Sequence, residues 1–208
     1  MELSWRVRAA FVLTVLSASV APAATAALTE ADAIRIFLEQ SPQARRVPLI
    51  AQSVGAALRV EARRHLGLEH PILDRLFELS ELLVDVLGVE DVGARFEGRV
   101  AWHDACHPLR ELGIRDQPRS LLAHVAGLEL IELRPSDECC AFGGTLSVKH
   151  AETSAGRGRR KVESIHASGA GVVASTEASC LMQIDGLLRR GGSAVRTLHL
   201  AQILGGED

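Results

Sequence analysis

Short apolar runs alternate with longer amphipathic segments over the second half of the chain. The apolar runs predict strands at residues 98–104, 128–133, 170–176 and 194–200. The amphipathic segments predict helices at residues 117–127, 151–169 and 178–192. Because strands that alternate with helices are typical of a mainly parallel sheet covered on both faces, we expect an α/β domain at residues 98–208. Its reactive loops should follow the carboxyl ends of the strands.

The first half of the chain shows helical periodicity instead. Apolar residues recur at helical spacing between Thr29 and Arg64, and the stretch "SPQ" divides them into two helices. A further helix is predicted at residues 73–88, where Gly88 suits a left-handed cap. We therefore expect an α-helical segment at 28–70 and a linking helix within 71–97, both ahead of the α/β domain.

Residues 1–27 have the pattern of a secretory signal peptide. Arg6 and Arg8 precede an apolar run that ends at Val20, and small residues follow it. The run is too short to span a bilayer, so no transmembrane anchor is predicted. The alternative is an amphipathic or buried N-terminal helix. The stretch that follows, up to about residue 64, resembles the mature start of TolC-type outer-membrane efflux proteins.

Composition narrows the class of protein. The chain has 208 residues, 47% of them hydrophobic, which is enough for a core, and its formal net charge is −3. No basic stripe interleaved with aromatic residues is present in the sequence, so nucleic acid is not an expected partner. Four cysteines are too few for a disulfide scaffold in a chain of this size. Metal binding or thiol chemistry is the better expectation.

All four cysteines lie just after predicted strands. Cys106 follows the first strand, Cys139 and Cys140 follow the second, and Cys180 begins the helix after the third. Because the carboxyl ends of parallel strands meet at one edge of a sheet, we expect the four thiols to lie close together. The alternative is ordinary core packing, since free cysteine is among the most buried residue types. Three separate loops would then bring sulfur to one edge by chance.

Metal ligation by cysteine requires the thiolate form. The start of a helix near Cys180 favours a thiolate there. Zinc accepts cysteine and histidine ligands, although the chain lacks a CxxC arm. An iron–sulfur cluster needs several thiolates on one face, and the glycines at 143 and 144 suit the tight bend that two adjacent cysteines would require. These residues alone leave both metals open.

Three motifs resemble a known family: "HDACH" at 103–107, "ECCAFGG" at 138–144 and "SCLMQI" at 179–184. They are similar to the signatures of the cysteine-rich CCG domain, and more closely to its second copy in the lactate utilization A family. That family is related to the glycolate oxidase iron–sulfur subunit and to a cysteine-rich component of heterodisulfide reductase. The resemblance runs from about Glu78 to the C-terminus. It implies an iron–sulfur cluster of the 4Fe-4S type, held by four cysteine ligands: Cys106, Cys139, Cys140 and Cys180. His103 and His107 would lie around these ligands, and no catalytic residue is implied.

The function implied by the resemblance is that of an electron-transfer component of a multi-subunit complex that oxidises L-lactate or glycolate. Its partners would be the other subunits, and its location would be the cytoplasm, whereas residues 1–27 taken alone favour export. Two alternatives stay open. The chain could be a truncated or fused CCG half-domain without independent activity, or a secreted protein that binds zinc or reacts through its thiols.

The chain departs from the family pattern at three places. The first of the family's two CCG domains is replaced by the signal-like and efflux-like segment. Ala141 stands where the family has glycine, in a loop for which we expect a positive φ. Gln183 stands where heterodisulfide reductase has the last cysteine of its CxxC pair. Elsewhere, Gly156 and Gly158 are each expected to weaken their helix by about 1 kcal/mol, and the basic run at 156–160 is interpreted as a solvated helix face.

Overall fold

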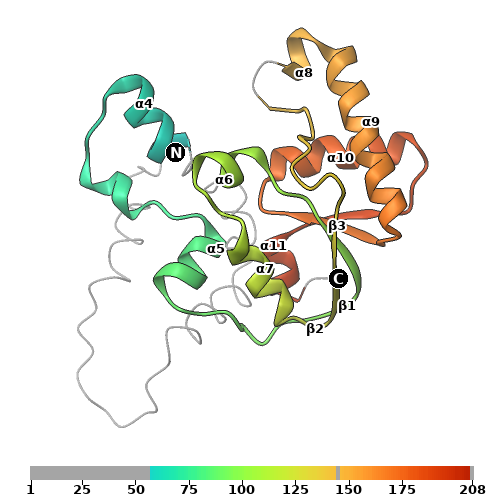
Figure 1. The fold of residues 1–208 in the computed structure, drawn as a ribbon, viewed down its shortest axis with the longest axis horizontal. Helices are drawn as coiled ribbons and strands as arrows, with labels where there is room; N and C mark the ends of the chain where they lie inside the picture. Colours follow the sequence, from blue (N-terminus) through green and yellow to red (C-terminus); the bar gives the residue numbers. More distant parts are fainter. Residues whose placement is uncertain (1–56, 144–145, 207–208) are drawn as a thin grey trace, which may run out of the picture.

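A computed structural model of the protein describes residues 57–143 and 146–206. Its centre is a four-stranded sheet in which every neighbouring pair is parallel, in the order β2-β1-β3-β4 (Figure 1). The strands are β1 (Arg95–Trp102), β2 (Ala126–Glu132), β3 (Val172–Ser175) and β4 (Arg196–His199). The predicted α/β class with a parallel sheet is therefore confirmed. The signal-peptide-like residues 1–27 and most of the efflux-like segment lie outside the described residues.

Helices cover both faces of the sheet. One hydrophobic cluster joins the sheet to α7 (Asp116–Ala123) and α11 (Leu200–Leu204). The other joins it to α9 (Ala151–Ser168) and α10 (Ala178–Arg190), which lie together on the opposite face (Figure 1). Since successive side chains of a strand point to opposite faces, the residues of β1 alternate between the two clusters. The central strand β3 and the last three residues of β1 are buried throughout, as expected where a sheet is covered on both faces.

The helix predicted at residues 73–88 is wrong as a single element. A 3-10 turn, η2 (Pro71–Arg75), is followed by α5 (Leu79–Glu81), which continues into η3 (Leu82–Val86). Glu78 separates them, because its side chain accepts hydrogen bonds from the amides of Ser80 and Glu81 and so begins a new helix. The expected left-handed end at Gly88 is confirmed by its φ of 65°.

Short elements ahead of the sheet were not predicted in detail. The described chain opens with η1 (Ala57–Glu61) and α4 (Ala62–Leu66), and Arg59 pairs with Glu81 at 2.7 Å. Two further short helices, α6 (Cys106–Glu111) and α8 (Leu146–Lys149), follow strand exits. Within residues 57–143 and 146–206, no helix is both long and apolar enough to cross a membrane.

Candidate metal centre

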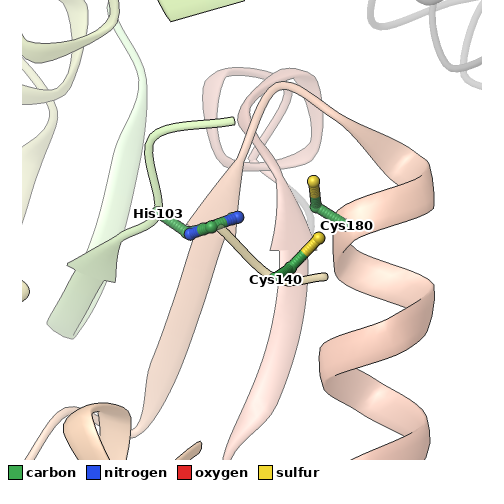
Figure 2. A group of neighbouring side chains, drawn as sticks. All are labelled: His103, Cys140 and Cys180. Atoms are coloured by element: carbon green, nitrogen blue, oxygen red, sulfur yellow. The ribbon is translucent and has the colours of Figure 1, made fainter. Parts of the chain in front are cut away.

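Three strand exits bring the predicted site residues to one edge of the sheet. His103 follows β1, Cys140 lies in the loop after β2, and Cys180 is in the first turn of α10, after β3. The side chains of all three point into one space (Figure 2). The ligand atoms of these residues all lie within 4.8 Å of one another, a spacing that can hold a metal ion.

The remaining cysteines extend this group. Cys106, the first residue of α6, contacts Cys139, which contacts Cys140, and Cys140 in turn contacts Cys180. Cys140 and Cys180 are only 1% and 6% exposed, whereas Cys106 and Cys139 are half-buried. The structure therefore brings the four cysteines together in a row that runs from the surface into the core. Their role as ligands stays a prediction.

Protons are unevenly distributed along this row. The hydrogen bond from Cys106, followed by that from Cys140, lowers the pKa of Cys139, and the contact with Cys140 lowers the pKa of Cys180 to about 6. The same contacts raise the pKa values of the donors, Cys106 and Cys140. Cys140 has a single S–H and donates to one neighbour at a time; Cys139 and Cys180 are the cysteines whose thiolate form these contacts favour, and the thiolate is the form of cysteine that binds metal.

His103 is the residue that ordinary packing does not explain. Its side chain is fully buried, and neither ring nitrogen makes a hydrogen bond of ordinary geometry in the described part of the chain, although the ring adds to the effect of Cys140 in lowering the pKa of the neighbouring Cys180 thiol. A buried polar group left without a partner costs about 1–3 kcal/mol, so such groups in folded proteins usually meet a protein atom, water or an ion. A metal ion beside Cys140 and Cys180 would satisfy one nitrogen. Core packing accounts for the buried cysteines but not for this ring.

The two flanking histidines differ in position. The sequence predicts that both histidines lie around the cysteine ligands without binding the metal. In the structure His103 points at the sulfur atoms and is itself a candidate ligand (Figure 2). Its backbone is fixed on both sides, since its amide donates to Ala174 O at 2.8 Å and its carbonyl accepts from Ser175 Oγ at 2.9 Å. His107 is exposed on α6, where its charge acts on Glu111.

The loop that carries the cysteine pair bends at Ala141. Its φ of 66° makes it the one residue other than glycine with a positive φ in the described part of the chain. The predicted need for a positive φ at this position is therefore confirmed. Gly143 has no positive φ, so the tight bend expected there falls at Ala141 instead, while Gly144 lies outside the described residues. The bend brings the Ala141 amide to 3.2 Å from Cys139 Sγ, to which it donates.

Helices α9 and α10 hold this loop from below. Ser154 Oγ donates to Ala141 O at 2.8 Å and accepts from Gln183 Nε2 at 3.1 Å. Gly158 lies so close that an added Cβ would be 3.5 Å from Cys140 O and only 2.3 Å from Leu187 Cδ1. Gly158 is therefore a close-approach residue, which its expected cost to the helix did not reveal. Gln183, at the position of the missing CxxC cysteine, supports the loop through Ser154.

A buried ion pair lies beside the centre. Asp104, next to His103, accepts two hydrogen bonds from Arg119 at 2.9 and 2.8 Å, and a third from Trp102 Nε1 at 2.9 Å. Arg119 also binds Glu132 through two hydrogen bonds. The carboxylate of Asp104 thus has its own counter-charge, and the arrangement fixes the start of the loop between β1 and Cys106.

Sequence reasoning missed Lys161. It is fully buried on α9, on the same face as Ser154, Gly158 and Ile165. The sequence pattern predicts a solvated face for the basic run before it, and Arg157, Arg159 and Arg160 are indeed exposed or partly exposed. Spacings of four, three and four residues lead from Ser154 to Gly158, Lys161 and Ile165, so the four residues share one helix face. The other three are small or apolar, and this pattern could have identified Lys161 as buried.

Comparison with known proteins agrees with this geometry. The family model described as "CCG: Cysteine-rich domain" matches residues 100–185. Lactate utilization protein A of Bacillus subtilis (strain 168) is 43% identical over 133 residues, which are 64% of this chain and 56% of that protein. The protein of the same name from Anoxybacillus flavithermus is 42% identical over 133 residues, with the same shares. That from Exiguobacterium sp. is 44% identical over 130 residues, 62% of this chain and 53% of that protein.

The matched segment contains every residue of the row. The chain spans about half the length of the curated relatives that it matches. The sheet, its flanking helices and the loops with His103, Cys106, Cys139, Cys140 and Cys180 all fall within or beside the matched residues. Residues 100–185 therefore form a cysteine-rich domain of the CCG family, in a chain similar to the lactate utilization A proteins.

Proposed function

We propose that the chain binds an iron–sulfur cluster through Cys106, Cys139, Cys140 and Cys180 and serves as an electron-transfer component in the oxidation of L-lactate or glycolate. The observation that carries the proposal is the row of four contacting cysteines from three separate strand exits, whose inner pair, Cys140 and Cys180, lies within 4.8 Å of a ring nitrogen of the buried His103. The relatives' name, lactate utilization protein A, supports the substrate class.

The donor set fits such a group. Clusters are held by cysteine thiolates, and histidine can replace cysteine on iron in some of them. When bound, a cluster accepts and releases single electrons. The residues of this chain would hold it: the Ala141 bend turns Cys139 and Cys140 toward the same space, and Cys180 adds a thiolate from the start of α10. Burial of Cys140 and Cys180 would keep water from that side.

In this proposal, electrons would pass to and from partner subunits in the cytoplasm. The half-buried side of the row, at Cys106 and Cys139, is the face at which such a partner could approach. The division into a leader at 1–27, a helical segment at 28–70, a linking segment at 71–97 and a cysteine-rich domain at 98–208 remains part of the proposal.

A single zinc ion is the second candidate, because one specific observation favours it. His103, Cys140 and Cys180 place one nitrogen and two sulfur ligands within 4.8 Å of one another, and zinc binds mixed cysteine and histidine sets. This candidate corresponds to the zinc- or thiol-binding alternative.

Anaerobic reconstitution of the full chain separates the two candidates. With iron and sulfide supplied, and zinc supplied in a parallel sample, the proposal expects bound iron and acid-labile sulfide in equal amounts, with broad visible absorption. A colourless protein that retains one zinc ion and no sulfide would favour the zinc site. A protein that retains neither would contradict metal binding altogether.

A further inference from the structure

Lys161 is a charged residue in a place where charge is costly. Its side chain is fully buried, and the chain has only one other lysine among its 23 basic residues. Its one hydrogen bond that is described, to Pro135 O, is long at 3.5 Å. An ammonium group has three donors, and burying it without compensation is expensive. Some negative group must therefore face it.

The position of Lys161 on α9 shows which negative groups lie near it. Gly158, three residues before Lys161 on the same face, lies against Cys140 O, and Pro135 stands in the loop that leads to the cysteine pair. Lys161 thus lies under the loop that carries Cys139 and Cys140. Burial lowers the pKa of the Lys161 ammonium group, while Glu138, Cys140, Asp104 and Cys139 act to raise it.

Both carboxylates already have other partners. Asp104 is held by Arg119 through two hydrogen bonds, and Glu138 pairs with Arg160 at 3.6 Å. Among the described residues His103 also acts on Cys139 and Cys180, but a metal-binding histidine is a neutral ring, so as a candidate ligand it would leave Lys161 as their buried cationic neighbour. The basic residue that acts on Cys106, Arg110, is at the surface, where solvent screens its charge.

We infer that Lys161 is the internal counter-charge of the centre: its buried ammonium group offsets the negative charge of the cysteine thiolates and so sets the reduction potential of the cluster that they hold. This inference rests on the proposed function. One-electron reduction makes such a centre more negative by one unit, and a nearby positive charge stabilises that reduced form. The potential should therefore fall when the charge is removed. Lysine suits the role as a compact point charge.

The test compares Lys161→Met with the matched control Lys149→Met, which removes the exposed lysine of α8. Full-length proteins are reconstituted anaerobically with iron and sulfide, and the midpoint potential is measured by titration with a chemical reductant. For Lys161→Met we expect a shift to more negative potential equivalent to a tenfold change in the ratio of reduced to oxidised protein, about 59 mV. Lys149→Met should leave the potential unchanged.

A second variant, Lys161→Gln, has a neutral side chain that is polar and shorter than lysine. It is compared with the wild-type protein if the methionine variant fails to fold. An equal negative shift in both variants supports a charge effect. An unchanged reduction potential contradicts the inference. A shift to more positive potential also contradicts it, because water that enters a distorted site would produce such a shift by solvating the more charged form. Absence of a cluster in the wild-type protein would instead refute the proposed function itself.

Discussion

Ala141 offers a quantitative test of the loop geometry. For residues other than glycine, a left-handed conformation costs about 1–2 kcal/mol, and Ala141 adopts one with φ 66° while fully buried. Ala141→Gly relieves that strain. The same change loses about 0.8 kcal/mol from the buried methyl group. It also loses about 0.4–1 kcal/mol because the unfolded chain gains freedom. The free energy of unfolding should therefore stay within about 1 kcal/mol of the wild-type value.

Ala174 provides the matched control. It is also fully buried, but it lies in β3 and is not among the positive-φ residues. Ala174→Gly loses the methyl group and the chain restriction with no strain to relieve, so it should destabilise the protein by about 1–2 kcal/mol. Urea unfolding of both variants, followed by circular dichroism on metal-free reduced protein, gives the comparison. Equal destabilisation by the two changes would refute the strained bend at Ala141.

Two further predictions concern the packing around the sheet. Gly156→Ala should raise the free energy of unfolding by up to about 1 kcal/mol, because it removes a helix-weakening residue and its Cβ would meet only Arg159 Nη2, at 3.8 Å. Gly158→Ala should gain less, because its Cβ would lie 2.3 Å from Leu187 Cδ1 and that side chain would have to move. Equal gains in urea unfolding would show that α9 does not approach α10 closely at Gly158. Burial lowers the pKa of His199 below the unfolded value of about 6.5, so its contribution to stability is present above that value and is lost as pH falls. Between about pH 6.5 and 5, His199→Gln should reduce the slope of the free energy of unfolding against pH by at most about 1.4 kcal/mol per pH unit. The exposed control His124→Gln should leave this slope unchanged. An unchanged slope in His199→Gln would contradict a neutral buried ring at His199.

The sheet and the order of its cysteine loops could be predicted because both depend on local patterns. Apolar runs of four to eight residues separated by amphipathic helices allow few arrangements, and parallel strands place their exits at one edge. Placement of Cys106, Cys139, Cys140 and Cys180 followed from that rule. The positive φ at Ala141 could be foreseen because the resemblance identified a glycine position.

Features that depend on contacts between distant elements could not be read from the pattern. Gly158 looks like a helix-weakening residue until α10 is packed against it, and Lys161 looks like the end of a solvated basic run. The ring nitrogens of His103, which lack an ordinary hydrogen bond, emerge only when the loop after β2 and the start of α10 surround the ring. The helix predicted across Glu78 failed for a similar reason, because its buried side chain caps a new helix.

X-ray absorption at the iron edge of the anaerobically reconstituted full chain tests the central claim most directly. A cluster held by the four cysteines of the row predicts an iron environment dominated by sulfur, with neighbouring iron atoms in the next shell and at most one nitrogen ligand, from His103. Cys140→Ser should lower the iron content and alter this environment. Iron surrounded by oxygen and nitrogen, without iron neighbours and unchanged in Cys140→Ser, would contradict a cluster held by the cysteine row.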